Sequence, residues 1–285
     1  MTKKTVAVLH PGEMGGAVAA NLVVRGHRVV WAGAGRSAAS RKRAEDARLE
    51  DLGTLERAVG AADIVLSVCP PHAAMDTGRA VAALGFRGVY VDANAIAPET
   101  TRAVGRLVEA SGASYVDGGI TGPPPVEGGR RRPRLYLSGK RSAEIVALFE
   151  GCIIEAIALD GPIGAASTIK VCYAAWNKGQ QAMLANIRAL AQQEGVDAAL
   201  LDEWKFGGWP DLPKQSETIA GNARKAWRWS GEMEEIAATF EALGLPGGFH
   251  LAAADIYRRL ESFKDAAKTP TMSDVTTTLL RTRRS

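Results

Sequence analysis

The feature that most constrains the fold of this chain is a glycine-rich turn between an apolar strand and a helix. Residues 6–9 (VAVL) predict a buried strand, and residues 10–16 (HPGEMGG) follow it directly. The helix that starts in this turn ends near Gly26, and residues 28–32 predict a second strand. This order of strand, turn, helix and strand is the local structure in which α/β proteins bind the pyrophosphate of a dinucleotide.

The glycines of this turn serve different purposes. Gly12 has no Cβ and lets the backbone approach the phosphates, whereas Gly15 lets the helix pack close to the strand. The helix N-terminus adds unpaired N–H groups and a partial positive charge. His10 replaces the first glycine of the G-x-G-x-x-G pattern. Because that glycine serves the turn rather than the phosphates, we expect the turn to accommodate His10 with a negative φ.

The length and composition are those of a globular protein with two domains. The chain has 285 residues, of which 46% are apolar and 23% are charged. It contains no apolar run of the ~20 residues that a membrane helix needs, and residues 1–4 lead straight into a strand rather than a signal peptide. We therefore expect a cytoplasmic protein that does not bind a membrane.

Metals, disulfides and nucleic acids are not expected. The three cysteines, Cys69, Cys152 and Cys172, are scattered in apolar stretches, which predicts reduced and buried thiols. The four histidines show no ligand spacing, so we expect no metal site. The net charge of +4 is modest, and its basic clusters at residues 130–134 and 281–284 are explained by a solvated loop and a frayed tail.

Strands and helices alternate through the first half of the chain. Further short strands are predicted at residues 63–68, 88–92, 114–117, 134–138 and 153–158, with helices at residues 73–84 and from Pro98 onward. Such alternation predicts an α/β domain with a mostly parallel, doubly wound Rossmann-type sheet that is covered on both faces.

A break at Gly161-Pro162 separates this pattern from a helical second half. Helices are predicted at about residues 164–194, 198–204, 215–242 and 248–264. The polar residues after Thr269 are expected to be loose. The prediction is therefore a nucleotide-binding domain at residues 1–160, an all-helical domain at 161–269 for substrate binding and dimerisation, and a tail at 270–285.

The segment after the second strand favours NADP over NAD. NAD-specific folds place an acid there to bind the ribose 2′-hydroxyl, but residues 31–44 contain none. A guanidinium group binds the oxygens of a 2′-phosphate through paired hydrogen bonds. The best-placed contacts are Arg36, Ser37 and then Arg41. The alternative is that the basic residues form the solvated face of a helix, which we expect for at least one of Lys42 and Arg43.

Open α/β sheets bind ligands beyond the carboxyl ends of their strands, where three further segments lie. Two of them follow the strands at residues 63–68 and 88–92, and the third is the glycine- and proline-rich segment 117–125. The predicted cofactor-binding residues are Gly12, Glu13, Met14, Gly15, Arg36, Ser37, Arg41, Cys69, Pro70 and Asn94. The predicted substrate-binding residues are Asp117, Gly118, Gly119, Thr121 and Gly122. An ordinary tight turn at 117–125 is the alternative.

The helix predicted to open the second half carries a possible acid–base group. Ser167, Lys170, Ala174 and Asn177 are spaced by three, four and three residues, which places them on one helical face. A desolvated lysine has a lowered pKa and can donate or accept a proton. The alternative is that Lys170 is simply exposed to solvent.

Four segments resemble motifs of one protein superfamily. They are GEMG at residues 12–15, NL…GH-x-V at 21–29, DGGITG at 117–122 and GAASTIK at 164–170. Through them the chain is identified as a member of the β-hydroxyacid dehydrogenase and 6-phosphogluconate dehydrogenase superfamily, which also contains imine reductases. Within it the chain most resembles bacterial NAD(P)-dependent oxidoreductases with their own helical C-terminal domain, matched here by AAWNKG at 174–179 and WRWSGEMEEI at 227–236.

The resemblance implies an enzyme that moves a hydride between NADP(H) and a small carbonyl or hydroxyacid-like substrate. Lys170 corresponds to the family's catalytic lysine and would act as general acid or base, while Ala174 replaces the family's usual asparagine. Asn177 one turn further on and Tyr173 beside it are therefore candidate catalytic residues with Lys170. Relatives pair their helical domains, which implies a homodimer.

Two other functions remain open. In the first, the protein is an imine reductase that reduces a C=N bond, with Tyr173 or Asp117 as proton donor, although a retained Lys170 favours C=O chemistry. In the second, it is an NADP-binding regulatory protein whose active site has decayed. The sequence does not identify the substrate.

Overall fold

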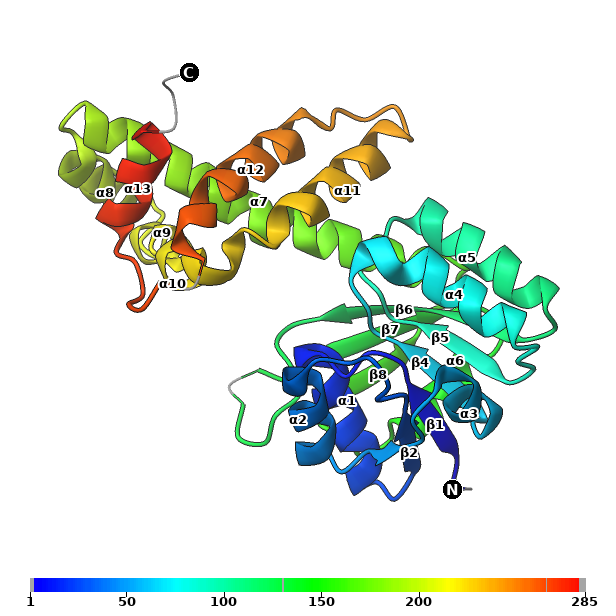
Figure 1. Ribbon diagram of the computed structural model, residues 1–285. Helices are drawn as coiled ribbons and strands as arrows, with labels where there is room; N and C mark the ends of the chain where they lie inside the picture. The colour runs from blue at the N-terminus through cyan, green and yellow to red at the C-terminus, as the bar shows by residue number, and fades with distance from the viewer. Residues whose placement is uncertain (1–2, 130, 265, 282–285) are drawn as a thin grey trace. The chain divides into compact units, whose positions relative to one another are not determined.

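The computed structural model describes residues 3–129, 131–264 and 266–281 (Figure 1). Contacts divide the chain into two compact units, Met1–Val171 and Cys172–Ser285. The first unit contains the sheet, which is eight-stranded over the described residues. Its strands are β1 (Thr5–Val8), β2 (Arg28–Trp31), β3 (Glu50–Asp51), β4 (Ile64–Ser67), β5 (Val89–Asp92), β6 (Ser114–Thr121), β7 (Arg134–Ser138) and β8 (Glu155–Ala158).

The sheet has the predicted doubly wound topology. Its strand order is β3-β2-β1-β4-β5-β6-β7-β8, and neighbouring strands are parallel except for β6 and β7. The chain reverses direction across the sheet between β1 and β4, which is where this class of fold binds its ligand. The helices of this unit are α1 (Glu13–Val24), α2 (Ala38–Asp46), α3 (Leu55–Gly60), η1 (Pro71–Ala73), α4 (Ala74–Ala83), α5 (Pro98–Ala110) and α6 (Ser142–Leu148).

Alternate residues of each strand supply two separate cores. Val6 and Val8 of β1 belong to one apolar cluster, and Ala7 between them belongs to the other. Figure 1 shows α1 and α2 on one side of the sheet and α4 and α5 on the other. Because both faces are covered, the carboxyl edge of the sheet remains as the place for a site.

Strand β6 extends further than the sequence indicated. Residues 118–121 were expected to belong to a loop, but they continue β6 and pair with β7, with Gly119 opposite Tyr136 and Thr121 opposite Arg134. The antiparallel partner supplies the hydrogen bonds that keep this glycine-containing segment extended. The glycine- and proline-rich loop therefore starts at Gly122, where φ is +94°.

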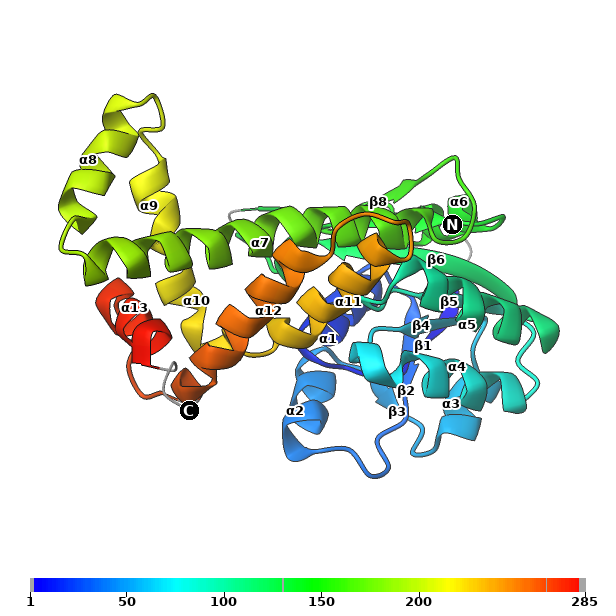
Figure 2. The same cartoon turned by 90° about the horizontal axis from the view of Figure 1, so that it is seen from above.

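The second unit is helical, as predicted, and includes most of α7 (Ala165–Gln193) (Figure 2). Its other helices are α8 (Asp197–Phe206), α9 (Leu212–Ser216), α10 (Thr218–Ala226), α11 (Trp229–Glu241), α12 (Gly248–Arg259), η2 (Leu260–Phe263) and α13 (Met272–Arg281). The single helix expected at residues 215–242 is interrupted at Glu217 and again at residues 227–228. No helix in the described part of the chain is long and apolar enough to cross a bilayer.

The expectation of a loose tail after Thr269 is wrong for the described residues. Residues 272–281 form α13, and Met272, Val275, Thr276 and Leu279 are buried on one face of it. Their spacing is that of an amphipathic helix, and the Thr276 hydroxyl is hydrogen-bonded to Gln192 of α7. Residues 282–285 lie outside the described part of the chain, as does Arg130.

Candidate functional site

The glycine-rich turn leaves the N-terminus of α1 open. Gly12 is the N-cap residue, has φ −73°, and offers no side chain to cap the helix. A Cβ at Gly12 would meet nothing within 4 Å, whereas one at Gly15 would lie 2.4 Å from the His10 carbonyl oxygen. Gly15 is thus required by packing within the turn, and the space at Gly12 is available to a phosphate.

His10 occupies the first position of the turn as expected. In the described residues the positive-φ position other than glycine is Arg48, so φ of His10 is not in the left-handed region. Its carbonyl accepts a 2.7 Å hydrogen bond from Gly12 N, which tightens the turn. Burial, with the nearby Arg36 cation, lowers the pKa of His10 to about 4, and the imidazole is therefore neutral at physiological pH.

Two arginines reach the turn from the segment after β2. Arg36 Nη2 donates to the carbonyl of Leu9 at 3.3 Å, and Arg43 Nε donates to the carbonyl of Pro11 at 3.0 Å. Arg41 Nε donates to the Arg36 carbonyl at 3.3 Å. The structure therefore brings the guanidinium groups of the basic segment to the glycine-rich turn.

The contact of Arg43 with the turn was not predicted from the sequence. Lys42 pairs with Asp46 on the exposed face of α2, as expected for one of these two basic residues. Arg43 follows it by about 100° around the helix and therefore faces the turn. Ser37 accepts a hydrogen bond from Ser40 N, so its hydroxyl caps α2.

An acidic side chain from the neighbouring strand lies beside the end of β2, although the residues that follow β2 in the sequence (32–44) contain no acid. Asp51 of β3 pairs with Trp31, and its Oδ1 accepts hydrogen bonds from Gly33 N at 2.9 Å and Gly53 N at 2.8 Å. Strand β3 was not predicted, because two residues are too short to give a periodic pattern. This carboxylate holds the loop after β2 in place.

Asn94 and Cys69 are brought together at the ends of β5 and β4. Asn94 Oδ1 accepts a 2.6 Å hydrogen bond from Cys69 N, and its Nδ2 donates to Ser67 Oγ at 3.1 Å. Asn94 is buried, and its amide joins the ends of β4 and β5. Burial raises the pKa of the Cys69 thiol. Cys152 is also buried, but Cys172 is exposed, against the expectation of three buried thiols.

Asp117 is not a substrate ligand or a proton donor, because its carboxylate is buried and fully engaged by the protein. It has 0% exposure, and its Oδ2 accepts hydrogen bonds from the backbone N–H groups of Gly164, Ala166 and Ser167 at 2.9, 3.0 and 3.1 Å. Ser138 Oγ donates to the same oxygen at 2.9 Å, and Ser167 Oγ donates to Oδ1 at 2.6 Å. Asp117 therefore caps the N-terminus of α7.

Gly119, which was expected to bind substrate, instead lets α7 approach the sheet, and Gly118 lets the end of β5 approach β6. A Cβ at Gly119 would lie 2.4 Å from the Ala166 carbonyl oxygen and 3.2 Å from Lys170 Cβ. At Gly118 it would lie 3.0 Å from the Asp92 carbonyl oxygen. Thr121 is buried. This close contact places Lys170 beside the end of β6.

Lys170 is half-buried, and within the described residues its ammonium group makes no ion pair or hydrogen bond. Ser167 was expected on the same face, but its hydroxyl is taken up by Asp117 and by Thr101, 2.8 Å away on α5. Tyr173 and Asn177 are half-buried residues of α7 in the second unit. The first unit thus presents an amine at the carboxyl edge of its sheet.

The described residues contain no group of three histidine, cysteine or acidic side chains that could hold a metal.

Two family models match the chain. Residues 5–143 match the NAD binding domain of 6-phosphogluconate dehydrogenase, and residues 191–260 match a domain of unknown function (DUF1932).

Several known proteins are similar to this chain in sequence or in structure. An uncharacterized 28.5 kDa protein in the 7S RNA 5′ region of Methanothermus fervidus is 27% identical over 169 residues, which is 59% of this chain and 63% of that protein. The chain therefore matches less than two thirds of this curated relative. Mycobacterium tuberculosis 3-hydroxyisobutyrate dehydrogenase, solved with L-serine, has a TM-score of 0.75 at 22% identity and covers 98% of this chain and 99% of its own.

An imine reductase from Bacillus cereus has a TM-score of 0.59 at 18% identity, covering 98% of this chain and 100% of its own. At these identities both likenesses show the fold rather than the substrate. Together with the family match they show a dinucleotide-binding domain followed by a helical domain, as the sequence motifs implied.

Proposed function

Because the N-terminal domain of this chain belongs to the NAD-binding family of 6-phosphogluconate dehydrogenase, we propose that the protein is an NADP(H)-dependent oxidoreductase. Its substrate would be a small carbonyl compound or the corresponding hydroxyacid-like alcohol. The observation that carries the proposal is the half-buried Lys170, held by an Asp117-capped helix at the carboxyl edge of the sheet. When bound, the nicotinamide supplies or accepts the hydride.

The residues of the turn fit a dinucleotide with a 2′-phosphate. The open N-terminus of α1 at Gly12 would receive the pyrophosphate, and Arg36 and Arg41 would receive the 2′-phosphate. Asp51 is the acid that could favour NAD, but its Oδ1 already accepts two backbone N–H groups. We therefore favour NADP(H).

Lys170 has the chemistry of a general acid. In the reductive direction its ammonium group donates a proton to the substrate oxygen while the carbonyl carbon accepts a hydride, and the product is an alcohol. The reverse reaction returns the proton to a neutral amine. Tyr173 and Asn177, which follow on α7, are proposed to contact the substrate.

The second candidate activity is reduction of a C=N bond. The fold is shared with an imine reductase, and the commitment of Asp117 to the cap of α7 leaves Tyr173 as the proton donor that such a reaction would use. This reaction consumes the same cofactor but needs no amine at Lys170.

One experiment separates these possibilities. NADPH and NADH are titrated by fluorescence, and turnover is then measured with ketones, β-ketoacids and cyclic imines for the wild type, Lys170→Met and the exposed control Lys140→Met. We expect tighter binding of NADPH, turnover of a carbonyl substrate, and a loss of at least 100-fold in kcat for Lys170→Met alone. Turnover of imines with full activity in Lys170→Met favours the imine reductase, and binding without any turnover favours a regulatory protein.

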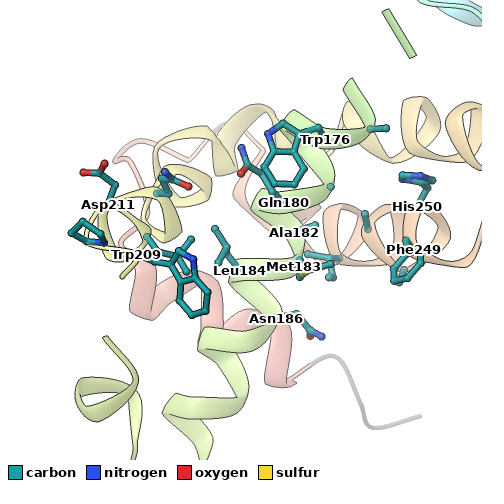
Figure 3. A pocket seen from close by; sticks show the side chains of 18 of the residues that line it. Trp176, Gln180, Ala182, Met183, Leu184, Asn186, Trp209, Asp211, Phe249 and His250 are labelled. Carbon is teal, nitrogen blue, oxygen red and sulfur yellow. The ribbon is translucent and has the colours of Figure 1, made fainter. Parts of the chain in front are cut away.

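We also propose a homodimer formed through the helical domain. An apolar pocket of about 790 Å³ opens between α7, the segment after α8 and α12 (Figure 3). Its large apolar side chains are exposed in the single chain, with Trp176 at 71%, Phe249 at 70% and Trp209 at 61%. Exposed aromatic patches of this kind support association with a partner.

A further inference from the structure

A row of buried polar side chains crosses four strands of the sheet at the level where β4 and β5 end. In the register of these strands Ser67 pairs with Asp92, Asp92 with Asp117, and Asp117 with Ser138. All four residues are at most 2% exposed. Residues in register on neighbouring strands point to the same face, so the two carboxylates are neighbours within the protein.

The carboxyl group of Asp92 is only partly satisfied within the described residues. Its Oδ1 accepts a hydrogen bond from Asn94 N at 3.1 Å, whereas Oδ2 is buried without a hydrogen bond of normal geometry. The hydroxyl oxygens of Tyr90 and Tyr115 are also buried without a hydrogen bond of normal geometry within these residues. These two rings stack at 5.9 Å and lie two residues before Asp92 and Asp117, on the same face.

Asp92 lies between the two halves of the proposed site. On one side its Oδ1 holds Asn94, which in turn holds Cys69 of the loop after β4. On the other side its strand neighbour Asp117 caps the helix that carries Lys170. A change in charge at Asp92 therefore acts on the cofactor loop and on the lysine helix together.

We propose that Asp92 is a positioning residue that carries a proton in the active protein, so that the row holds one negative charge rather than two. Loss of this proton places two carboxylates on adjacent strands in a buried setting. The repulsion disturbs both the Asn94 clamp and the Asp117 cap, and activity falls. The inference rests on the proposed function, because the loop and the helix are those of the proposed site.

The surroundings of Asp92 support a neutral group. Burial raises the pKa of Asp92 to about 7, the Asp117 carboxylate adds to the rise, and the Asn94 backbone N–H and the Tyr115 hydroxyl oppose it. The other titratable groups that face it are neutral near this pH, because burial raises the pKa of Tyr90, Tyr115 and Cys69. Asp117 is therefore the charge that Asp92 meets on the neighbouring strand.

The test compares the pH profiles of the wild type and Asp92→Asn, which keeps the acceptor for Asn94 and cannot ionise. With half-ionisation near pH 7 the protonated fraction falls about tenfold between pH 6 and pH 8. We expect kcat/KM of the wild type to fall about tenfold over this range, while Asp92→Asn retains its pH 6 value. A fall in activity that both proteins share is assigned to other groups and not to Asp92. Identical profiles in both proteins overturn the proposal.

Two further measurements keep the proposal testable if turnover is absent or the variant does not fold. NADPH affinity of the wild type is titrated over the same pH range, and the carboxyl carbons of aspartate-labelled protein are followed by NMR. We expect one buried carboxyl to titrate near pH 7 and NADPH affinity to fall with it. If no turnover is found, the proposed function fails while this titration still decides the inference. A spectrum in which every aspartate titrates below pH 5 overturns it.

Discussion

The cap of α7 gives the sharpest test of how this site is held together. Five hydrogen bonds converge on Asp117, three of them from the backbone N–H groups of Gly164, Ala166 and Ser167. A hydrogen bond to a charged group contributes about 1.5–3 kcal/mol, compared with about 0.5–1.5 kcal/mol for a neutral pair. The two ranges differ by about 1 kcal/mol per bond, so removing the charge from the three backbone bonds in Asp117→Asn predicts a loss of about 3 kcal/mol in the free energy of unfolding.

Deleting the side chain should cost more. Asp117→Ala leaves three backbone N–H groups at a helix end without their acceptor, and each buried unsatisfied group costs about 1–3 kcal/mol. We expect a total loss of about 4–6 kcal/mol, with partial compensation by water. The exposed Asp160→Asn serves as the matched control and should change stability by less than about 0.5 kcal/mol.

The assay is urea unfolding followed by far-UV circular dichroism, with kcat measured on the folded fraction. The reasoning is refuted if Asp117→Asn is as stable as the wild type but loses kcat. That result would assign Asp117 to proton transfer and not to the cap.

The other predictions concern the turn, the buried acid and association. Gly12→Ala should change the free energy of unfolding by less than about 0.5 kcal/mol but weaken NADPH binding at least tenfold, and unchanged NADPH affinity in a fluorescence titration contradicts the phosphate site. Gly15→Ala should lower the free energy of unfolding, measured in urea, by about 1–3 kcal/mol because its Cβ clashes with the His10 carbonyl oxygen. Because the folded pKa of Asp92 is raised from 3.8 to about 7, the free energy of unfolding of the wild type should fall by about 4 kcal/mol relative to Asp92→Asn as pH rises from 4 to 8, and then level off. Parallel pH–stability curves contradict this. Trp176→Ser should shift the protein from dimer to monomer in sedimentation at micromolar concentration, and a variant that sediments like the wild type contradicts the proposed interface.

Local patterns predicted the elements well where they were strongly periodic. The first strand, the glycine-rich turn, the start of α5 and the boundaries of β7 could be predicted because an apolar run, a glycine or a proline marks each of them. What could not be predicted depends on contacts between distant segments. Asp117 was predicted to be a ligand because the sequence around it gives no sign of the helix N-terminus that it caps, which begins 47 residues later.

The roles of other polar residues were hidden for the same reason. Asp51 lies on a strand of two residues, and its partner Gly33 is 18 residues away. Asn94 follows a strand as a ligand would, yet its amide is used by Cys69, 25 residues earlier. A single sequence shows which side chains reach the edge of the sheet, but it does not show which of them bond to one another there.

The arginines at the turn have a consequence for any attempt to change the coenzyme preference of this protein. Arg36 and Arg43 donate to the carbonyls of Leu9 and Pro11, whose oxygens would otherwise present negative dipoles near an incoming phosphate. Replacing them to change the proposed preference for NADP would therefore also expose these dipoles and loosen the glycine-rich turn. A redesign toward NAD must supply new donors to the two carbonyls before it removes the cations.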